Sequence, residues 1–199
     1  MKKLLIIAVM AVCAAGHAYA QEAEEVKDAW QKTITVPASQ ASVIEKLFNA
    51  WGTQFPGKFV DAFNKYKKTG KADRVRYYGE FADFKVAFAP KNGYIEISME
   101  AEKEHTLTAV YWNLPNGNKL LGVSICDAGE IFNNCALAFY EYNTAKGTLT
   151  PREGTTNKVL NQINNEEVFV ILPKEGKDLK YYDYPSGTYK IIKWNGNGF

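Results

Sequence analysis

The chain has 199 residues, of which 46% are hydrophobic and 14% aromatic, and it carries 24 Lys and Arg against 22 Asp and Glu, for a net charge of +2. That length is enough to bury a substantial core. The near-neutral charge gives no electrostatic reason to bind nucleic acid or anionic lipid, so we expect neither partner.

Residues 1–20 have the pattern of a secretory signal peptide. Two lysines precede a short apolar run, and small residues at 18 and 20 form a cleavage site. Cys13 follows Val12 rather than the small residue that lipid-modified signals require, which favours cleavage over lipidation. The apolar run is too short to span a bilayer, and no later run is long enough. We therefore expect an exported protein without membrane insertion (periplasmic, cell-surface or secreted), with residues 21–199 forming one α+β domain.

Cleavage changes both the charge and the chemistry of the chain. It leaves 22 basic and 22 acidic residues, and it leaves His105 as the one histidine. Because metal sites and Ser-His-Asp or Cys-His machinery usually need histidine, we expect neither metal nor cofactor and assign no catalytic residue.

Two cysteines, Cys126 and Cys135, remain after cleavage. An even number of cysteines in an oxidising compartment favours a disulfide. Its loop of about 10 residues would be worth roughly 2.5–3 kcal/mol in the chain-entropy model. The alternative is a pair of buried free thiols.

The N-terminal part predicts helices. After Ser39, a capping residue, residues 40–51 repeat apolar side chains at one-face spacing. A second helix follows the break at residues 55–57 and ends near Gly70. We expect both helices to pack their apolar faces on a sheet.

From Phe84 onward the apolar period changes to two, which predicts an antiparallel meander of seven to nine strands. The Asn92-Gly93 pair is a strong hairpin signal. Taken as a two-residue loop, it places Phe88 opposite Ile97.

The same reasoning aligns the central strands. The Asn-Gly pair at 116–117 places Trp112 opposite Leu121. The following pair of strands is aligned by setting Cys126 opposite Cys135. Both faces of these strands are apolar, so we expect this hairpin to be covered on both sides.

The C-terminal part predicts a turn, a helix and a last group of strands. Residues 143–147 form the turn, residues 155–163 have weak helical spacing, and residues 168–172 form an apolar strand. A final hairpin is predicted from 179–184 and 189–194, with Tyr182 opposite Ile191 and Asp183 opposite Lys190.

Several phrases in this half resemble an uncharacterised family of exported proteins from Gram-negative gut bacteria. They are Tyr111-Trp112 with Asn116-Gly117 and Leu120-Leu121, residues 139–142 with 147–151, residues 172–179, and Trp194-Asn195-Gly196. The resemblance implies an envelope or secreted location and transfers no functional residue.

Aromatic residues at the strand ends are the candidate contact surface. Tyr and Trp offer flat, amphipathic area for a saccharide or a protein. The candidates are Tyr182, Tyr184, Trp112, Tyr140 and Tyr142. The first two have the best claim to exposure, because they share a strand face with Lys180. The alternative is that all five are ordinary strand residues that pair across the sheet.

Acidic residues gather at Glu96, Glu100, Glu102 and Glu104, beside His105. They suggest either a cation site or a carboxylate pair for glycoside hydrolysis. The alternative is a solvated strand face. Ser124 lacks the Gly-x-Ser-x-Gly elbow of a hydrolase nucleophile.

We therefore expect an α+β fold with N-terminal helices packed on the meander, and a non-catalytic binding or interaction protein. Its ligand would be a glycan or an envelope protein. The alternatives are a secreted carboxylate-dependent hydrolase and a structural or inhibitor-like protein.

Overall fold

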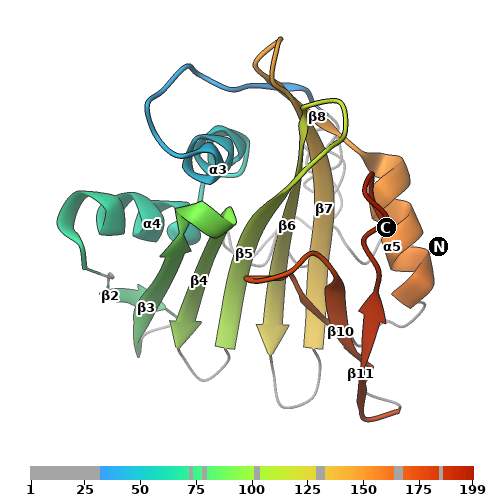
Figure 1. Cartoon of the computed structure of the whole chain (residues 1–199). Helices are drawn as coiled ribbons and strands as arrows, with labels where there is room; N and C mark the ends of the chain where they lie inside the picture. The colour runs from blue at the N-terminus through green and yellow to red at the C-terminus, as the bar shows by residue number, and fades with distance from the viewer. Residues whose placement is uncertain are drawn as a thin grey trace.

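The computed structural model describes residues 32–71, 74–77, 80–100, 104–128, 133–163, 168–183 and 186–199. The predicted signal peptide lies outside these ranges. The architecture is α+β, as predicted: helices α3 (Val43–Gln54) and α4 (Lys58–Thr69) come before the antiparallel meander and pack on it (Figure 1).

Two sheets take the place of the single predicted meander. The large sheet has eight strands in the order β1-β8-β7-β6-β5-β4-β3-β2. They are β1 (Ile34–Thr35), β2 (Arg74–Tyr77), β3 (Glu80–Ala89), β4 (Tyr94–Glu100), β5 (Glu104–Asn113), β6 (Lys119–Ala128), β7 (Asn133–Asn143) and β8 (Thr148–Pro151).

The last three strands form a separate small sheet, in the order β11-β10-β9, instead of extending the large one. They are β9 (Val168–Ile171), β10 (Leu179–Asp183) and β11 (Thr188–Ile192), and helix α5 (Glu153–Ile163) precedes them. The predicted helix and strands of the C-terminal part are therefore confirmed, and their assembly into a second sheet is new.

The helices form because their apolar residues recur on one side. In α3 the buried stripe includes Ile44, Leu47, Phe48 and Trp51. Helix α3 starts later than predicted, with Ser42 at its N-cap, and the Ser39 hydroxyl accepts the Ala41 N–H at 3.0 Å before the first helical turn.

Helix α4 packs its aromatic residues edge-on against β3. The rings of Phe63 and Phe88 have centroids 5.5 Å apart, and those of Phe59 and Phe84 are 5.7 Å apart. The helix ends at Gly70, as predicted, because that residue adopts a left-handed φ of 70° that favours glycine.

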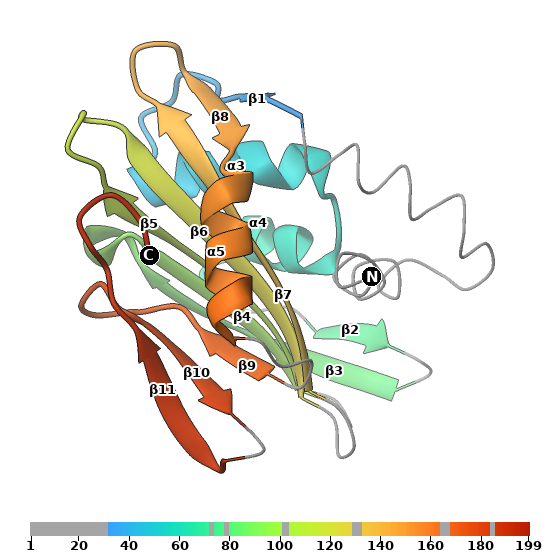
Figure 2. The ribbon, with the colours of Figure 1, turned by 90° about the vertical axis from the view of Figure 1, so that its right-hand side faces the viewer.

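The large sheet has a core on each side, as predicted for its central hairpin. On the helix face, α3 and α4 cover side chains such as Ile95, Leu107 and Val123. On the opposite face, named here the α5 face, α5 and the small sheet cover residues such as Trp112 and Phe139. Figure 2 shows the two layers on either side of the large sheet.

The β6–β7 register is confirmed, with Cys126 opposite Cys135. The β3–β4 register is shifted from the prediction, since Phe88 pairs with Ile95 rather than Ile97. The chain turns through a 3-10 segment that starts at Pro90, and Gly93 donates its N–H to the Pro90 carbonyl at 3.2 Å. The shift is two residues, so the predicted faces hold.

The predicted β5–β6 register is wrong by one residue, since Trp112 pairs with Leu120 rather than Leu121. Gly117 donates its N–H to the Leu114 carbonyl at 3.1 Å, which closes the turn. Pro115 lies in this loop. Its fixed φ suits the first turn position, and it has no N–H to donate to a strand ladder. The slip moves Trp112 to the α5 face.

The final hairpin is also shifted, by two residues. Tyr182 pairs with Tyr189 rather than Ile191, and Asp183 pairs with Thr188 rather than Lys190. The turn closes at Asp183, whose carbonyl accepts the Gly187 N–H at 2.9 Å. The predicted faces of these strands are again preserved.

Candidate functional site

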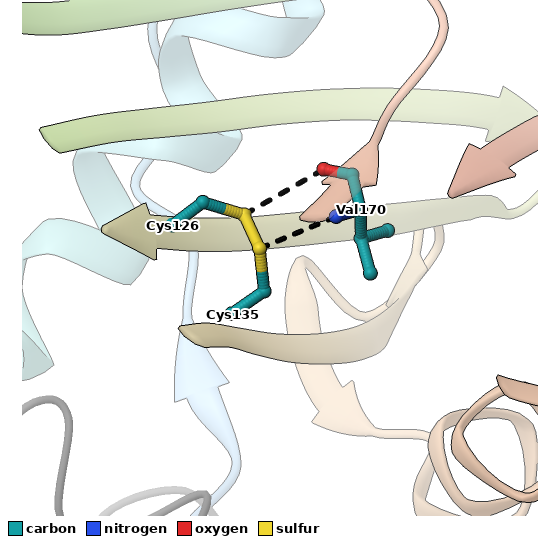
Figure 3. The surroundings of a disulfide bond; sticks show 3 residues. All are labelled: Cys126, Cys135 and Val170. Atoms are coloured by element: carbon teal, nitrogen blue, oxygen red, sulfur yellow. Dashed lines mark hydrogen bonds between the residues drawn. A yellow bond between two sulfur atoms is a disulfide. The ribbon is translucent and has the colours of Figure 1, made fainter. Parts of the chain in front are cut away.

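One edge of the small sheet contacts a disulfide of the large sheet. Cys126 and Cys135 are bonded across β6 and β7, which confirms the predicted disulfide. Val170 of β9 donates its N–H to Cys135 Sγ at 3.2 Å, and its carbonyl oxygen lies 3.6 Å from Cys126 Sγ (Figure 3). Strand β9 is therefore next to the large sheet, and β11 lies farthest from it (Figure 2).

One face of the small sheet is part of the protein core. Val170, Leu179, Tyr181 and Ile192 are all buried there, in the cluster that contains Val159 of α5. This inner face holds the small sheet against the rest of the molecule.

The opposite face, named here the outer face, is mostly apolar. The strand registers place two residues of each strand on it: Phe169 and Ile171 of β9, Lys180 and Tyr182 of β10, and Tyr189 and Ile191 of β11. Tyr189 is 63% exposed and Ile191 is 52% exposed, and among the described residues they are the large hydrophobic side chains that lie open to solvent. The Tyr182 and Tyr189 rings meet edge to face, with centroids 5.0 Å apart.

Two lysines in or just after the β10–β11 hairpin form ion pairs with nearby acidic residues. Lys190 pairs with Asp183, and that hydrogen bond raises the pKa of the Lys190 ammonium above its ordinary value. Lys193 contacts Asp178 at 2.8 Å, and this contact is the main cause of a lowered Asp178 pKa. Lys180 is the charged residue of the outer face.

Three of the predicted contact residues are core residues, which corrects their placement on a surface. Trp112 is 4% exposed, donates its indole N–H to the Lys177 carbonyl at 2.9 Å and stacks on Trp194. Tyr140 is fully buried, and burial raises the pKa of its hydroxyl. Tyr142 is buried beside Lys46.

These three residues also point to different sides of the large sheet. Tyr140 and Tyr142 belong to the helix-face core, whereas Trp112 belongs to the α5-face core. Of the five predicted residues, the structure places Tyr182 on the outer face, and Tyr184 lies outside the described residues.

The described part of the predicted acidic cluster is not gathered on one face of the sheet. Positions 96 and 100 share one strand, β4, so their Cα atoms are about 13 Å apart, beyond the roughly 5–9.5 Å between glycosidase carboxyl groups. His105 pairs with Met99 on the helix face, whereas Glu96 is on the α5 face. The predicted Glu102 and the side chains of Glu100 and Glu104 lie outside the described residues.

Sequence reasoning missed most of the outer face. The alternation in residues 188–192 could have identified Tyr189 and Ile191 as residues of one strand face. Only the register of the three strands shows that Phe169 and Ile171 lie on that same face.

A hollow of about 300 Å³ lies at the start of α5, lined by Arg152 and Lys158 together with backbone and amide groups. The Arg152 guanidinium is committed to Glu141. Among the described residues, this hollow therefore offers Lys158 without an ion-pair partner and no assembled anion site.

Within the described ranges, no cluster of three or more His, Cys, Asp or Glu side chains could hold a metal ion. None of the helices in those ranges has the length and apolarity to cross a membrane. Comparisons of the chain with known protein families, curated proteins and solved structures found no match.

Proposed function

We propose that this chain is an exported, non-catalytic binding protein that engages another protein through the outer face. The observation that carries the proposal is the exposure of Tyr189 and Ile191, 63% and 52%, side by side on the edge strand β11. A contiguous exposed apolar patch on a protein surface is a common mark of an interaction site.

The composition of the outer face favours a protein over a glycan. Ile171 and Ile191 lie on either side of Lys180, so this row of the outer face places one charged side chain between two aliphatic ones. Sugar sites combine an aromatic platform with several polar groups that fix orientation, whereas protein interfaces join aromatic and aliphatic contacts. The edge-to-face Tyr182–Tyr189 pair also offers no shared flat platform.

The open edge of β11 supports the same conclusion. In the described part of the chain, β11 pairs with β10 on one side and with no strand on the other. An open edge presents backbone N–H and C=O groups that an extended segment of a partner can use. The ion pairs of Lys190 and Lys193 direct these charges back to their own chain.

Site-specific photo-crosslinking in producing cells tests the proposal. A photoreactive amino acid replaces Tyr189 or Ile191, and the matched control replaces Asn64, an exposed residue of α4. We expect discrete protein adducts from positions 189 and 191 and none from position 64. No protein adduct at either position, or adducts to glycan alone, would remove the proposed function.

A further inference from the structure

We infer that Asn197 is a site of spontaneous deamidation, where the chain converts a side-chain amide into a carboxylate within the hollow at the start of α5. The site shares no residue with the outer face, so the inference is independent of the proposed function. The reaction favours a glycine after the asparagine, because a glycine N–H is the least hindered backbone nucleophile. The chain has Asn-Gly pairs at residues 92–93, 116–117, 195–196 and 197–198.

The structure protects two of these pairs. Gly93 donates its N–H to the Pro90 carbonyl at 3.2 Å, and Gly117 donates its N–H to the Leu114 carbonyl at 3.1 Å. A backbone amide held by a hydrogen bond in a closed turn must open before its nitrogen can attack the neighbouring side chain. The asparagines of these two pairs should therefore react slowly while the protein is folded.

The pair at residues 197–198 has no such protection. Among the described residues, neither the Gly198 N–H nor the side-chain amide of Asn197 makes a hydrogen bond. The pair at residues 195–196 is more restrained, because the Asn195 side-chain oxygen accepts the Asn197 N–H at 3.0 Å. Asn197 is exposed, so its side chain is free to approach the Gly198 nitrogen.

The hollow supplies the surroundings that the reaction needs. Asn197 and Gly198 line its volume of about 300 Å³ together with the cations Arg152 and Lys158, so water and positive charge are both present. The Gly198 nitrogen bonds to Asn197 Cγ, and its proton passes through water to the side-chain nitrogen, which leaves as ammonia. Water then opens the cyclic imide at either carbonyl, which gives aspartate or isoaspartate at position 197. Nearby cations stabilise the negative charge that develops during the attack.

The product fits the charge of the hollow. Arg152 is already paired with Glu141, whereas Lys158 has no ion-pair partner in the described part of the chain. A carboxylate at position 197 supplies that partner. Isoaspartate also adds one carbon to the main chain two residues before Phe199, whose side chain is buried in the α5-face core. The isoaspartate form should therefore loosen this side chain from the core.

The test is peptide mapping of the folded, disulfide-bonded protein after incubation at mildly alkaline pH. Trypsin releases residues 92–103, 104–119 and 194–199 as separate peptides, and fragmentation of the last one separates position 195 from position 197. We expect conversion at position 197 to be about tenfold faster than at positions 92 and 116. The matched control is the same protein, reduced and unfolded in denaturant. There the three regions should react at similar rates, because the protecting hydrogen bonds are gone.

Two lysine variants test the contribution of the hollow. Lys158→Gln should slow conversion at position 197 about twofold, because it removes one exposed cation, and Lys174→Gln, at an exposed lysine outside the hollow, should leave the rate unchanged. Melting curves check that both variants fold. Conversion at position 92, 116 or 195 that equals or exceeds that at 197 in the folded protein overturns the inference. A K158Q rate equal to the parent rate overturns the role of the hollow.

Discussion

Val170 donates its backbone N–H to Cys135 Sγ at 3.2 Å, although the two residues belong to different sheets. The contact uses the edge of β9 that faces away from β10, so the disulfide both joins β6 to β7 and supports the small sheet. This contact and the buried inner face together fix the position of the outer face in the molecule.

Removal of the disulfide should therefore weaken the whole domain. In the chain-entropy model, Cys126→Ala with Cys135→Ala costs about 2.5–3 kcal/mol of unfolding free energy. Urea unfolding measures the loss, and hydrogen exchange should show a faster Val170 amide. A loss below about 1 kcal/mol with an unchanged Val170 amide would contradict the supporting role of the disulfide.

The same substitution should cost very different amounts of unfolding free energy at two tyrosines of the small sheet. Tyr181 is 7% exposed on the inner face and Tyr189 is 63% exposed on the outer face. Tyr181→Ser should cost about 3 kcal/mol or more, because it removes a buried ring, whereas Tyr189→Ser should stay within about 0.5 kcal/mol. Chemical denaturation of both variants checks the face assignment, and equal costs would refute it.

Two glycines test the turn geometry. Gly93 and Gly117 both have positive φ, 67° and 82°, but a Cβ at Gly93 would meet the Tyr111 ring at 2.6 Å, whereas at Gly117 it would meet open space. Gly117→Ala should cost about 1–2 kcal/mol from left-handed strain. Gly93→Ala should cost about 1–3 kcal/mol more from overpacking. Thermal melts of the pair give the comparison, and a G93A no worse than G117A would contradict the packing of Tyr111.

The Glu141 carboxylate should contribute to acid sensitivity. Burial acts to raise its pKa, but hydrogen bonds from Asn118 and Asn116 and the Arg152 charge together lower it below 4.5. Because the pKa of Glu141 is lower in the folded state, its ionised carboxylate stabilises the protein at pH values above the unfolded-state pKa. This stabilisation is lost as the pH falls through the folded-state pKa. Glu141→Gln should therefore flatten the loss of stability on acidification below about pH 4.5, measured by urea unfolding at several pH values. A slope identical to that of the parent chain would show that this network does not titrate with folding.

The parts of the fold that sequence predicts well are those set by a single local rule. The β6–β7 register followed from aligning Cys126 with Cys135, and helix α4 ended at Gly70 as its glycine indicated. The Asn-Gly rule located the hairpins but not their loop lengths, because Pro90 and Pro115 entered the turns. At Pro115 this changed the register by one residue and exchanged the two faces of β5 relative to β6.

The candidate site was harder to predict because exposure depends on the assembly of distant strands. Composition identified aromatic residues, but Trp112 and Tyr140 are buried by layers that come from other parts of the chain. No local sequence pattern indicates that β9, β10 and β11 form a sheet of their own that contacts the disulfide. That separation leaves Tyr189 and Ile191 uncovered.

Hydroxyl-radical footprinting of the folded protein is the most direct test of an uncovered outer face. It compares residues of the same type on opposite faces of one hairpin: Tyr189 with Tyr181, and Ile191 with Ile192. We expect Tyr189 and Ile191 to oxidise about tenfold faster than their buried counterparts, in keeping with 63% and 52% exposure against 7% and 4%. Equal protection of Tyr189 and Tyr181 would show that the outer face is covered in the native protein, and would contradict its role as a binding surface.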